Sequence, residues 1–343
     1  MNTPVKTDGF AFVEFVSPRP SELIDLFKRL GFRLRGKSKN EMYLMTQGTA
    51  AFIVNGNASA FQSKHGASVR AIGIHVSDAR LAHAQALSGG ARTASPDTEG
   101  MFVIDTPTIL GIGESLVYFV DTDFHEVFSL PVEARQVAVG DAHIMAVDHT
   151  SNIVHPENLD RWADFYRDTF GFAEKQYLEI KGHMSGMRAR SMVSPCGRVS
   201  IPVAAAAHDQ PGVLNQNDEF IRDYGGEGIQ HIALLTSDIE VTIEKLKAVG
   251  IEFMTAPSQN YYDGIDARLP DHGLDVERLA KRGILVDGKG PQKLLLQRFT
   301  KRQIGPVFFE IIERRGEDGF GEGNFKALFE SQEKEQQQRG SLQ

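Results

Sequence analysis

Two histidines and one glutamate in the C-terminal half could together bind a metal ion. His149, His231 and Glu310 each lie inside or beside a short apolar run, at nearly equal spacing along the chain. Buried imidazole and carboxylate groups need polar partners or a metal. Two histidines and one carboxylate form one face of an octahedron and leave positions open, as in non-haem Fe(II) oxygenases. The three residues therefore indicate an iron site, provided that the fold brings them together.

Each of these residues has another interpretation when it is taken alone. A single histidine in an apolar strand is also typical of a hydrogen-bonded core residue. Glu310 is the stronger candidate, because an unpaired carboxylate in an apolar run would be costly to bury. Asp148 and Glu313 are alternative ligands by type, although the alternation of a strand places Asp148 on the opposite face from His149.

The elements that must position these residues belong to a repeat. The chain contains four similar strand–helix units, two in each half. In two of them a serine–aspartate pair, Ser77 and Asp78 or Ser237 and Asp238, offers a helix N-cap. After the last of these helices we expect a second strand to start at Ile251. The four units cover residues 10–34, 69–94, 144–173 and 229–254. Further strands are expected at 41–54, 115–120 and 294–299.

Units this small cannot bury their own apolar faces, so they should pair. We predict an α+β fold of duplicated βαβββ modules, which form two open, barrel-like sheets around a cavity in each half, with a C-terminal lid helix. The predicted domains are residues 1–140, a scaffold and assembly domain without a metal, and residues 141–343, the catalytic domain. A linker is expected near residues 135–143, where the two halves meet.

The N-terminal half lacks the metal-binding set. Ala71 stands where His231 would be, and Val13 or Glu14 stands near the place of His149. Tyr118 or a neighbour replaces the glutamate. The repeat alone indicates gene duplication and packing and nothing more, so the difference between the halves is what points to function in the second.

Composition excludes several classes of protein. The 343 residues suggest about two domains. The formal net charge is −8, so we expect no nucleic-acid partner. Cys196 is the only cysteine, which fits a reducing compartment and removes cysteine-rich zinc sites. The N-terminus has no apolar signal region and no run is long enough to span a bilayer, so we expect a cytoplasmic protein without membrane contact.

Several C-terminal segments give the chain a family resemblance that covers nearly its whole length. It resembles the 4-hydroxyphenylpyruvate dioxygenase family of the vicinal oxygen chelate superfamily. The last of these segments is long and specific, and it is shared with the related 4-hydroxymandelate synthases. The segments are Gly228–Ala233, Arg268–Gly273, Arg282–Leu285, Leu294–Gln297, Gly305–Glu310 and Gly319–Ser331.

The resemblance implies that His149, His231 and Glu310 bind Fe(II). It implies an aryl 2-oxo acid substrate that chelates the iron, and O2 as the second substrate. The reaction would be oxidative decarboxylation, ring hydroxylation and side-chain migration, giving homogentisate and CO2 in tyrosine and phenylalanine catabolism. No separate protein acid or base is assigned, and a homo-oligomer, a tetramer or a dimer, is expected.

The resemblance also implies a substrate pocket of amide and aromatic side chains. Amides can orient a keto acid or a phenol without adding charge beside the iron, and aromatic residues would form the wall. Phe325, Leu328 and Phe329 give the C-terminal helix one apolar face. That face would either simply dock the helix or make it a lid that excludes water. The implied substrate-binding residues are Pro202, Gln216, Gln230, Gln297, Phe299, Phe308, Phe320, Asn324 and Phe325.

Two departures from the family pattern bear on the substrate. Ala204 stands where the family usually has asparagine, and Ala189 where it usually has serine. Both changes remove hydrogen-bonding groups, so a 4-hydroxymandelate synthase or a dioxygenase of a related aryl 2-oxo acid is the alternative function. Pro202 and Phe325 agree with the dioxygenase. An extradiol catechol dioxygenase and a metal-free binding protein on the same scaffold are further alternatives.

Overall fold

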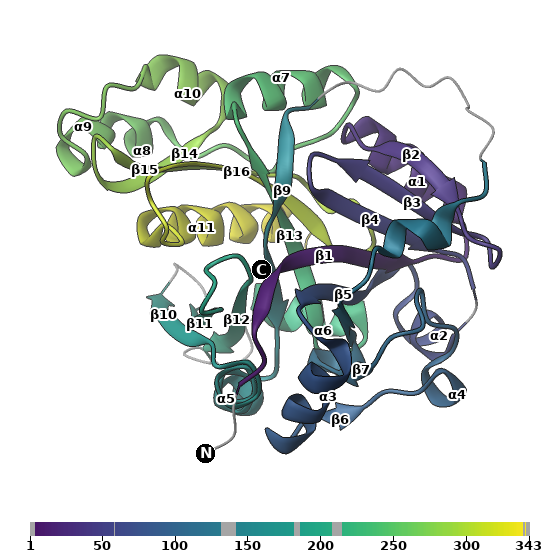
Figure 1. Cartoon of the computed structure of the whole chain (residues 1–343). Coiled ribbons are helices and arrows are strands. Elements are labelled where there is room, and N and C mark those ends of the chain that lie inside the picture. The colour runs from purple at the N-terminus through teal and green to yellow at the C-terminus, as the bar shows by residue number, and fades with distance from the viewer. Residues whose placement is uncertain are drawn as a thin grey trace.

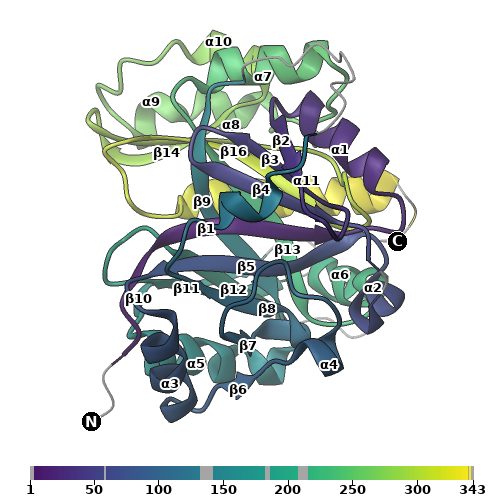
Figure 2. The ribbon, with the colours of Figure 1, turned by 45° about the vertical axis from the view of Figure 1, so that its right-hand side comes forward.

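Two eight-stranded sheets make up the framework of the computed structural model, which describes residues 4–57, 59–131, 142–181, 186–207, 215–338 and 340. The first sheet has the order β2-β3-β4-β1-β5-β8-β7-β6, and the second repeats it as β10-β11-β12-β9-β13-β16-β15-β14. Figures 1 and 2 show the two sheets side by side. The first comprises β1 (Thr7–Val16), β2 (Arg33–Lys37), β3 (Met42–Gln47), β4 (Ala50–Asn55), β5 (Ser68–Val76), β6 (Arg92–Thr93), β7 (Thr108–Leu110) and β8 (Leu116–Val120). The second comprises β9 (Ile144–Ile153), β10 (Ala173–Lys181), β11 (Gly186–Val193), β12 (Ser200–Ala207), β13 (Gly228–Thr236), β14 (Leu285–Gly290), β15 (Lys293–Phe299) and β16 (Phe308–Arg315).

Each sheet consists of two βαβββ modules, which confirms the predicted fold class. In every module the first and last strands pair in parallel, as β13 does with β16. The antiparallel pairs β1–β5 and β9–β13 join the two modules of a sheet. The described helices are α1 (Pro20–Arg29), α2 (Ala60–His65), α3 (Ala79–Ser88), α4 (Pro96–Glu99), α5 (Leu159–Phe170), α6 (Gln216–Tyr224), α7 (Ile239–Ala248), α8 (Gln259–Asp263), α9 (Ile265–Arg268), α10 (Val276–Arg282) and α11 (Glu322–Gln338).

The helix starts expected from the repeat are confirmed. The Asp78 carboxylate accepts a hydrogen bond from the backbone N–H of Leu81 at the start of α3, and Asp238 accepts one from Val241 at the start of α7. Such side-chain caps satisfy N–H groups that have no partner within the helix. The helices α3 and α7 therefore begin at equivalent points, just after β5 and β13 end.

Two strand predictions need correction. The run 41–54 forms two strands, β3 and β4, because the chain turns at Gly48, which has a positive φ. An added Cβ there would lie 2.4 Å from the Met145 carbonyl oxygen, so the turn also needs glycine for its close approach to the second half. The strand expected from Ile251 is absent, and only an isolated bridge joins Phe253 to Thr300. The chain instead passes through α8, α9 and α10 before β14, an insertion that the other modules lack in their described residues.

One apolar core runs through both halves of the molecule. Phe309 of β16 lies among Phe15, Phe27 and Phe52 of the first sheet, with ring centroids 6.4, 6.3 and 6.0 Å away. The strand that carries Glu310 is therefore supported from behind by the N-terminal half. The linker expected near residues 135–143 lies mostly outside the described residues, and the division of the chain at residue 140 stays a prediction.

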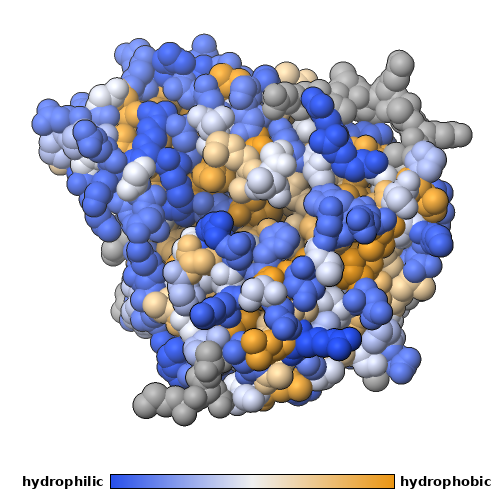
Figure 3. Space-filling model, in the orientation of Figure 1, coloured by the Kyte–Doolittle hydropathy of each residue, from blue (hydrophilic) through white to orange (hydrophobic). Residues whose placement is uncertain are grey.

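The last helix, α11, lies in the open side of the second sheet, between β14–β16 and β10–β12 (Figure 1). The surface is largely hydrophilic on the face seen in Figure 3, where apolar residues appear in scattered patches. Among the described residues, no helix combines the length and apolar character needed to cross a membrane.

Candidate metal centre and active site

The register of three central strands brings His149, His231 and Glu310 together. His149 on β9 and Glu310 on β16 both pair with Ala233, and His231 lies two residues earlier on β13. Since side chains two residues apart share a face of a strand, all three point to one side of the sheet. Their exposed fractions are 3%, 4% and 1%. All three side chains are buried.

The three side chains present their ligand atoms to a common point. Glu310 Oε2 lies 3.3 Å from His149 Nε2 and 3.6 Å from His231 Nε2. One ligand atom from each residue lies within 4.8 Å of the others, and within the described ranges these residues form the one group of this kind. Two imidazoles and one carboxylate are a donor set that suits a divalent transition metal, so the buried group could hold such an ion.

Asp148 orients His149 and is not a ligand. Its carboxylate lies on the other face of β9, as predicted, and accepts a hydrogen bond from His149 Nδ1 at 2.7 Å. Arg314 donates to the same carboxylate from Nε at 2.7 Å and from a terminal nitrogen at 2.8 Å. A hydrogen bond on one ring nitrogen fixes the tautomer and aims the other nitrogen at the metal. Glu313 is also not a ligand, because its carboxylate accepts from Ile239 N at the start of α7.

The surroundings shift the pKa values of the two histidines in opposite directions. Although burial lowers it, the nearby carboxylates of Glu310 and Asp148 raise the pKa of His149 to about 9. Burial, together with the charge on His149, holds the pKa of His231 well below its ordinary value. Burial alone would raise the pKa of Asp148, but hydrogen bonds from Arg314 and His149 bring it well below its usual range. Without a metal, therefore, a proton on His149 balances Glu310.

Five of the predicted substrate-binding residues lie around the metal-binding group. A small hollow beside the three ligands is bounded by Gln297, Phe299, Phe320, Phe325 and also Leu328 of α11. Gln297 Nε2 donates to Glu310 Oε1 at 2.8 Å, and Asn324 Nδ2 donates to Gln297 Oε1 at 2.7 Å. Asn324 therefore reaches the centre through Gln297.

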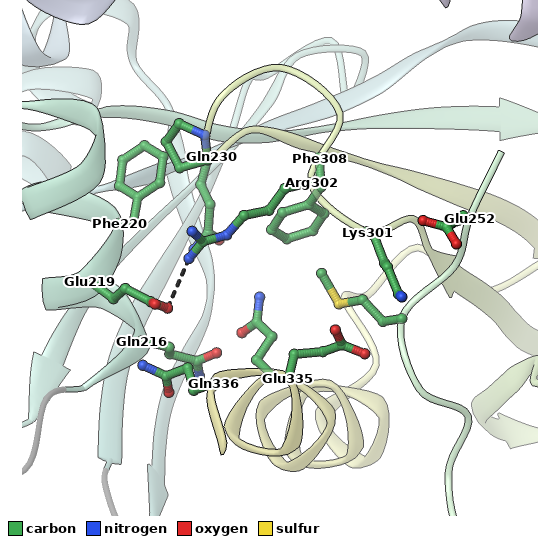
Figure 4. Close-up of a pocket in the computed structure, with 13 residues that line it drawn as sticks. Gln216, Glu219, Phe220, Gln230, Glu252, Lys301, Arg302, Phe308, Glu335 and Gln336 are labelled. Atoms are coloured by element: carbon green, nitrogen blue, oxygen red, sulfur yellow. Dashed lines mark hydrogen bonds and ion pairs between the residues drawn. The ribbon is translucent and has the colours of Figure 1, made fainter. Parts of the chain in front are cut away.

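The remaining predicted residues line two adjoining hollows. The first contains Pro202, Gln230 and Phe325 together with both departures from the family pattern, Ala189 and Ala204, which pair across β11 and β12. The second is a more open hollow of about 340 Å³, lined by Gln216, Gln230 and Phe308. Figure 4 shows this second hollow, with Glu335 and Gln336 extending from α11 below it and the Glu219–Arg302 ion pair on its wall.

Two amides on these walls have buried polar atoms without hydrogen-bond partners. They are both side-chain polar atoms of Gln216 and the Nδ2 atom of Asn217. Buried polar groups are normally paired, so an unpaired amide at a hollow is a candidate for contact with a ligand. Asn217 was not predicted. The signal in the sequence was its position beside Gln216, where it reads as part of a polar turn.

The matching place in the first sheet is filled with apolar and aromatic side chains, and the Tyr118 hydroxyl there donates to the buried Glu14 carboxylate. Its three equivalents are Phe12, which pairs with Gly73 as His149 pairs with Ala233, and Ala71 and Tyr118. The Phe12 and Tyr118 rings lie 5.5 Å apart. The predictions of Ala71 and Tyr118 are confirmed. The prediction of Val13 or Glu14 is wrong. β1 and β9 have the same register shift, so Phe10 and Phe12 of β1 match Val147 and His149 of β9.

Comparisons with known proteins bear on the family and the fold. A family model described as "Hydroxyphenylpyruvate dioxygenase, HPPD, N-terminal" matches residues 1–130, and one described as "Glyoxalase/Bleomycin resistance protein/Dioxygenase superfamily" matches residues 146–274. A 4-hydroxyphenylpyruvate dioxygenase of Legionella pneumophila is 41% identical, over 99% of this chain and 98% of its own. One of Pseudomonas aeruginosa is 39% identical with the same coverage. A solved mutant of 4-hydroxymandelate synthase from Streptomyces coelicolor superposes with a TM-score of 0.79 at 22% identity, over 97% of this chain and 100% of its own, and so shows the fold.

Proposed function

The chain belongs to the 4-hydroxyphenylpyruvate dioxygenase family, and from this premise we propose that it converts 4-hydroxyphenylpyruvate and O2 to homogentisate and CO2 at an Fe(II) ion held by His149, His231 and Glu310. The observation that carries the proposal is the convergence of these three buried side chains on one point. Two neutral nitrogens and one carboxylate are the donor set of non-haem Fe(II) oxygenases.

The protein contributes the orientation of the ligands and of the substrate. When bound, Fe(II) would coordinate the 2-oxo acid and activate O2. Asp148 fixes His149, Gln297 fixes the Glu310 carboxylate, and the amide of Gln230 lies within reach of the substrate hollow. The phenyl rings of Phe299, Phe308, Phe320 and Phe325 surround the ligands and keep water away from a reactive centre.

Substrate binding requires α11 to move. The hollow beside His231 has a volume of only about 20 Å³, which is room for about one water molecule. Phe325 and Leu328 of α11 line both small hollows, so this helix is the element that closes them. We therefore assign α11 the role of a lid, which opens to admit the 2-oxo acid and closes over it.

Ala189 and Ala204 bear on which product forms, because both line the hollow beside His231. Their methyl groups make one wall of the hollow apolar, while the unpaired Asn217 Nδ2 on another wall could bind a polar group of the substrate. A 4-hydroxymandelate synthase, or a dioxygenase of a related aryl 2-oxo acid, would use the same ligands. Product identity separates these functions, and stoichiometric release of CO2 separates all of them from an extradiol catechol dioxygenase.

The test is O2 uptake by the Fe(II)-loaded protein with 4-hydroxyphenylpyruvate, with the products identified by mass. We expect homogentisate and one CO2 for each O2 consumed. Hydroxymandelate in its place would show that the chain is a synthase. Bound iron without O2 uptake would show that the substrate is a different 2-oxo acid. The cytoplasmic location and the homo-oligomer, a dimer or a tetramer, stay predictions from the sequence.

A further inference from the structure

A continuous chain of hydrogen bonds joins the lid helix to the carboxylate ligand. From Glu310 Oε1 it passes to Gln297 at 2.8 Å and on to Asn324 at 2.7 Å. It continues from Asn324 Oδ1 to the hydroxyl of Tyr261 at 2.8 Å, and this hydroxyl accepts from the backbone N–H of Val286 at 2.7 Å. Gln297 is 4% exposed and Asn324 1%, so the two links nearest Glu310 are buried, and the link to the Tyr261 hydroxyl is partly buried.

All the donors in this chain point toward Glu310. An N–H of Gln297 must face the carboxylate, because its carbonyl oxygen there would repel the negative charge. Gln297 then presents its oxygen to Asn324, and Asn324 presents its oxygen to the Tyr261 hydroxyl. Hydrogen bonds aligned in this way polarise one another in a buried environment. The Tyr261 hydroxyl could instead donate to the Val286 carbonyl oxygen, which is 3.0 Å away, but Asn324 Oδ1 would then lose its hydrogen-bond donor.

The links come from elements that are far apart in the sequence. Glu310 lies on β16, Gln297 on β15, Asn324 in the first turn of α11, and Tyr261 on α8. Helix α8 belongs to the insertion between α7 and β14. Among the described residues, this insertion occurs in the fourth module, whose strand β14 contacts α11. The Arg268 guanidinium lies 4.8 Å from the Tyr261 ring centroid and packs against the ring.

The same insertion and β14 hold α11 at further points. Thr255 donates from its backbone N–H and its hydroxyl to Glu335, and its carbonyl accepts from the Ser331 hydroxyl. Asp287 accepts from Gly323 N at the start of the helix. These contacts hold the helix in place, but only the contact through Tyr261 and Asn324 leads to a metal ligand.

We propose that Tyr261 is a positioning residue that couples closure of α11 to the orientation of the Glu310 carboxylate. With α11 closed, Tyr261 holds Asn324 against Gln297, and Gln297 holds Oε1 so that Oε2 faces the two histidines. With α11 displaced, Gln297 loses the Asn324 donor and Glu310 is held less firmly. The inference rests on the proposed function, since it takes Glu310 as a ligand.

The test compares Tyr261→Phe with Tyr262→Phe in the full-length chain. Tyr262 is a matched control, because its buried hydroxyl has no hydrogen-bond partner and it adjoins Tyr261 on α8. The first readout is the rate at which bound Co(II), a redox-stable substitute for Fe(II), is lost to a chelator. The second is hydrogen exchange of backbone amides at residues 320–329 in the metal-free protein.

We expect Tyr261→Phe to speed both Co(II) loss and exchange by about threefold to tenfold, the effect of one net hydrogen bond. Tyr262→Phe should match the wild type in both. Asn324→Ala should speed Co(II) loss at least as much as Tyr261→Phe, and the double variant should add nothing to Asn324→Ala, because both act through one chain of bonds.

Two results would overturn the inference. If Tyr261→Phe behaves as Tyr262→Phe does in both readouts, Tyr261 does not couple the lid to the ligand, while the proposed function stands. If the wild-type chain binds no Co(II), the proposed function fails and the inference fails with it. Two controls identify faster Co(II) loss that comes from general destabilisation of the fold. Such a variant would unfold at a lower temperature, and its backbone amides would also exchange faster throughout β9 and β13.

Discussion

At the scale of single residues, two of the three side chains that would bind the metal are each held by a second side chain behind them. Asp148 holds His149 Nδ1, and Gln297 holds Glu310 Oε1. Partners of this kind hold the ligand side chain in one orientation. Metal binding then costs less conformational entropy, because the side chain is already ordered. The protein thereby forms the centre before the metal arrives.

The charge balance of the centre gives a pH dependence for metal binding. His149 has its pKa raised to about 9 in the metal-free chain, so below that pH a metal ion must displace its proton. We expect the apparent affinity for Co(II) to rise by about tenfold per pH unit between about pH 6 and pH 8. Titrations in matched buffers measure it, and an affinity that does not change over this range would show that His149 is not protonated.

The same proton contributes to the stability of the metal-free fold. Because the pKa of His149 is about 9 when folded and about 6.5 when unfolded, its contribution is complete below about pH 6.5 and disappears as the pH rises through about 9. The loss should be absent in the metal-loaded protein, where no proton occupies Nε2.

Side-chain type and position in apolar runs were enough to predict His149, His231 and Glu310 as a group. They were not enough to predict Asp148 as the partner of His149, because alternation shows which face a residue occupies but not that a carboxylate reaches around the strand. Phe12 was missed for a related reason, since the equivalence of Phe12 and His149 depends on how each strand pairs with its neighbour, which cannot be read from one strand alone.

At the scale of elements, the repeat explains why the ligands come together. Asp238 and its equivalent Asp78 begin the helices that connect strands in the second module of each sheet. The caps and the buried face of α7 follow from the sequence pattern. The hairpin at Gly48 and the insertion after α7 do not, because a turn depends on one glycine and the insertion has no counterpart in the other units.

Removing a cap should weaken the fold without changing the centre. Asp238→Ala leaves the N–H of Val241 unpaired, and we expect a loss of about 1 kcal/mol in the free energy of unfolding. Asp78→Ala should cost a similar amount, since its cap has the same geometry. Denaturant unfolding measures both. A loss of Co(II) binding in Asp238→Ala at low denaturant would contradict a purely structural role.

At the scale of the whole molecule, the half without the metal-binding set supports the half that has it. Phe309 adjoins Glu310 on β16 and contacts a cluster of phenylalanines from the first sheet. Neighbouring residues on a strand point to opposite faces, so one sheet packs behind the strand whose front carries the ligand. This dependence could not be predicted from the sequence, because it requires knowing how the two sheets face each other.

A substitution that creates a cavity in this phenylalanine cluster should also weaken metal binding. Phe52 stacks on Phe32 at 4.2 Å and lies 6.0 Å from Phe309. We expect Phe52→Ala to cost about 3–5 kcal/mol in unfolding free energy and to weaken Co(II) binding, because β16 loses support. Leu81→Ala, at a side chain that is 55% exposed, is the control and should change neither. Full metal affinity in a destabilised Phe52→Ala protein would show that the two halves act independently.

The most direct test of the central claim is Fe(II) binding under anaerobic conditions by the wild type, His231→Ala and His75→Ala. His75 lies on β5 in the half without the set and serves as the control. We predict one Fe(II) per chain in the wild type and in His75→Ala, and none in a folded His231→Ala protein. Stoichiometric iron in His231→Ala, or none in the wild type, would contradict the assignment of His149, His231 and Glu310 as the metal centre.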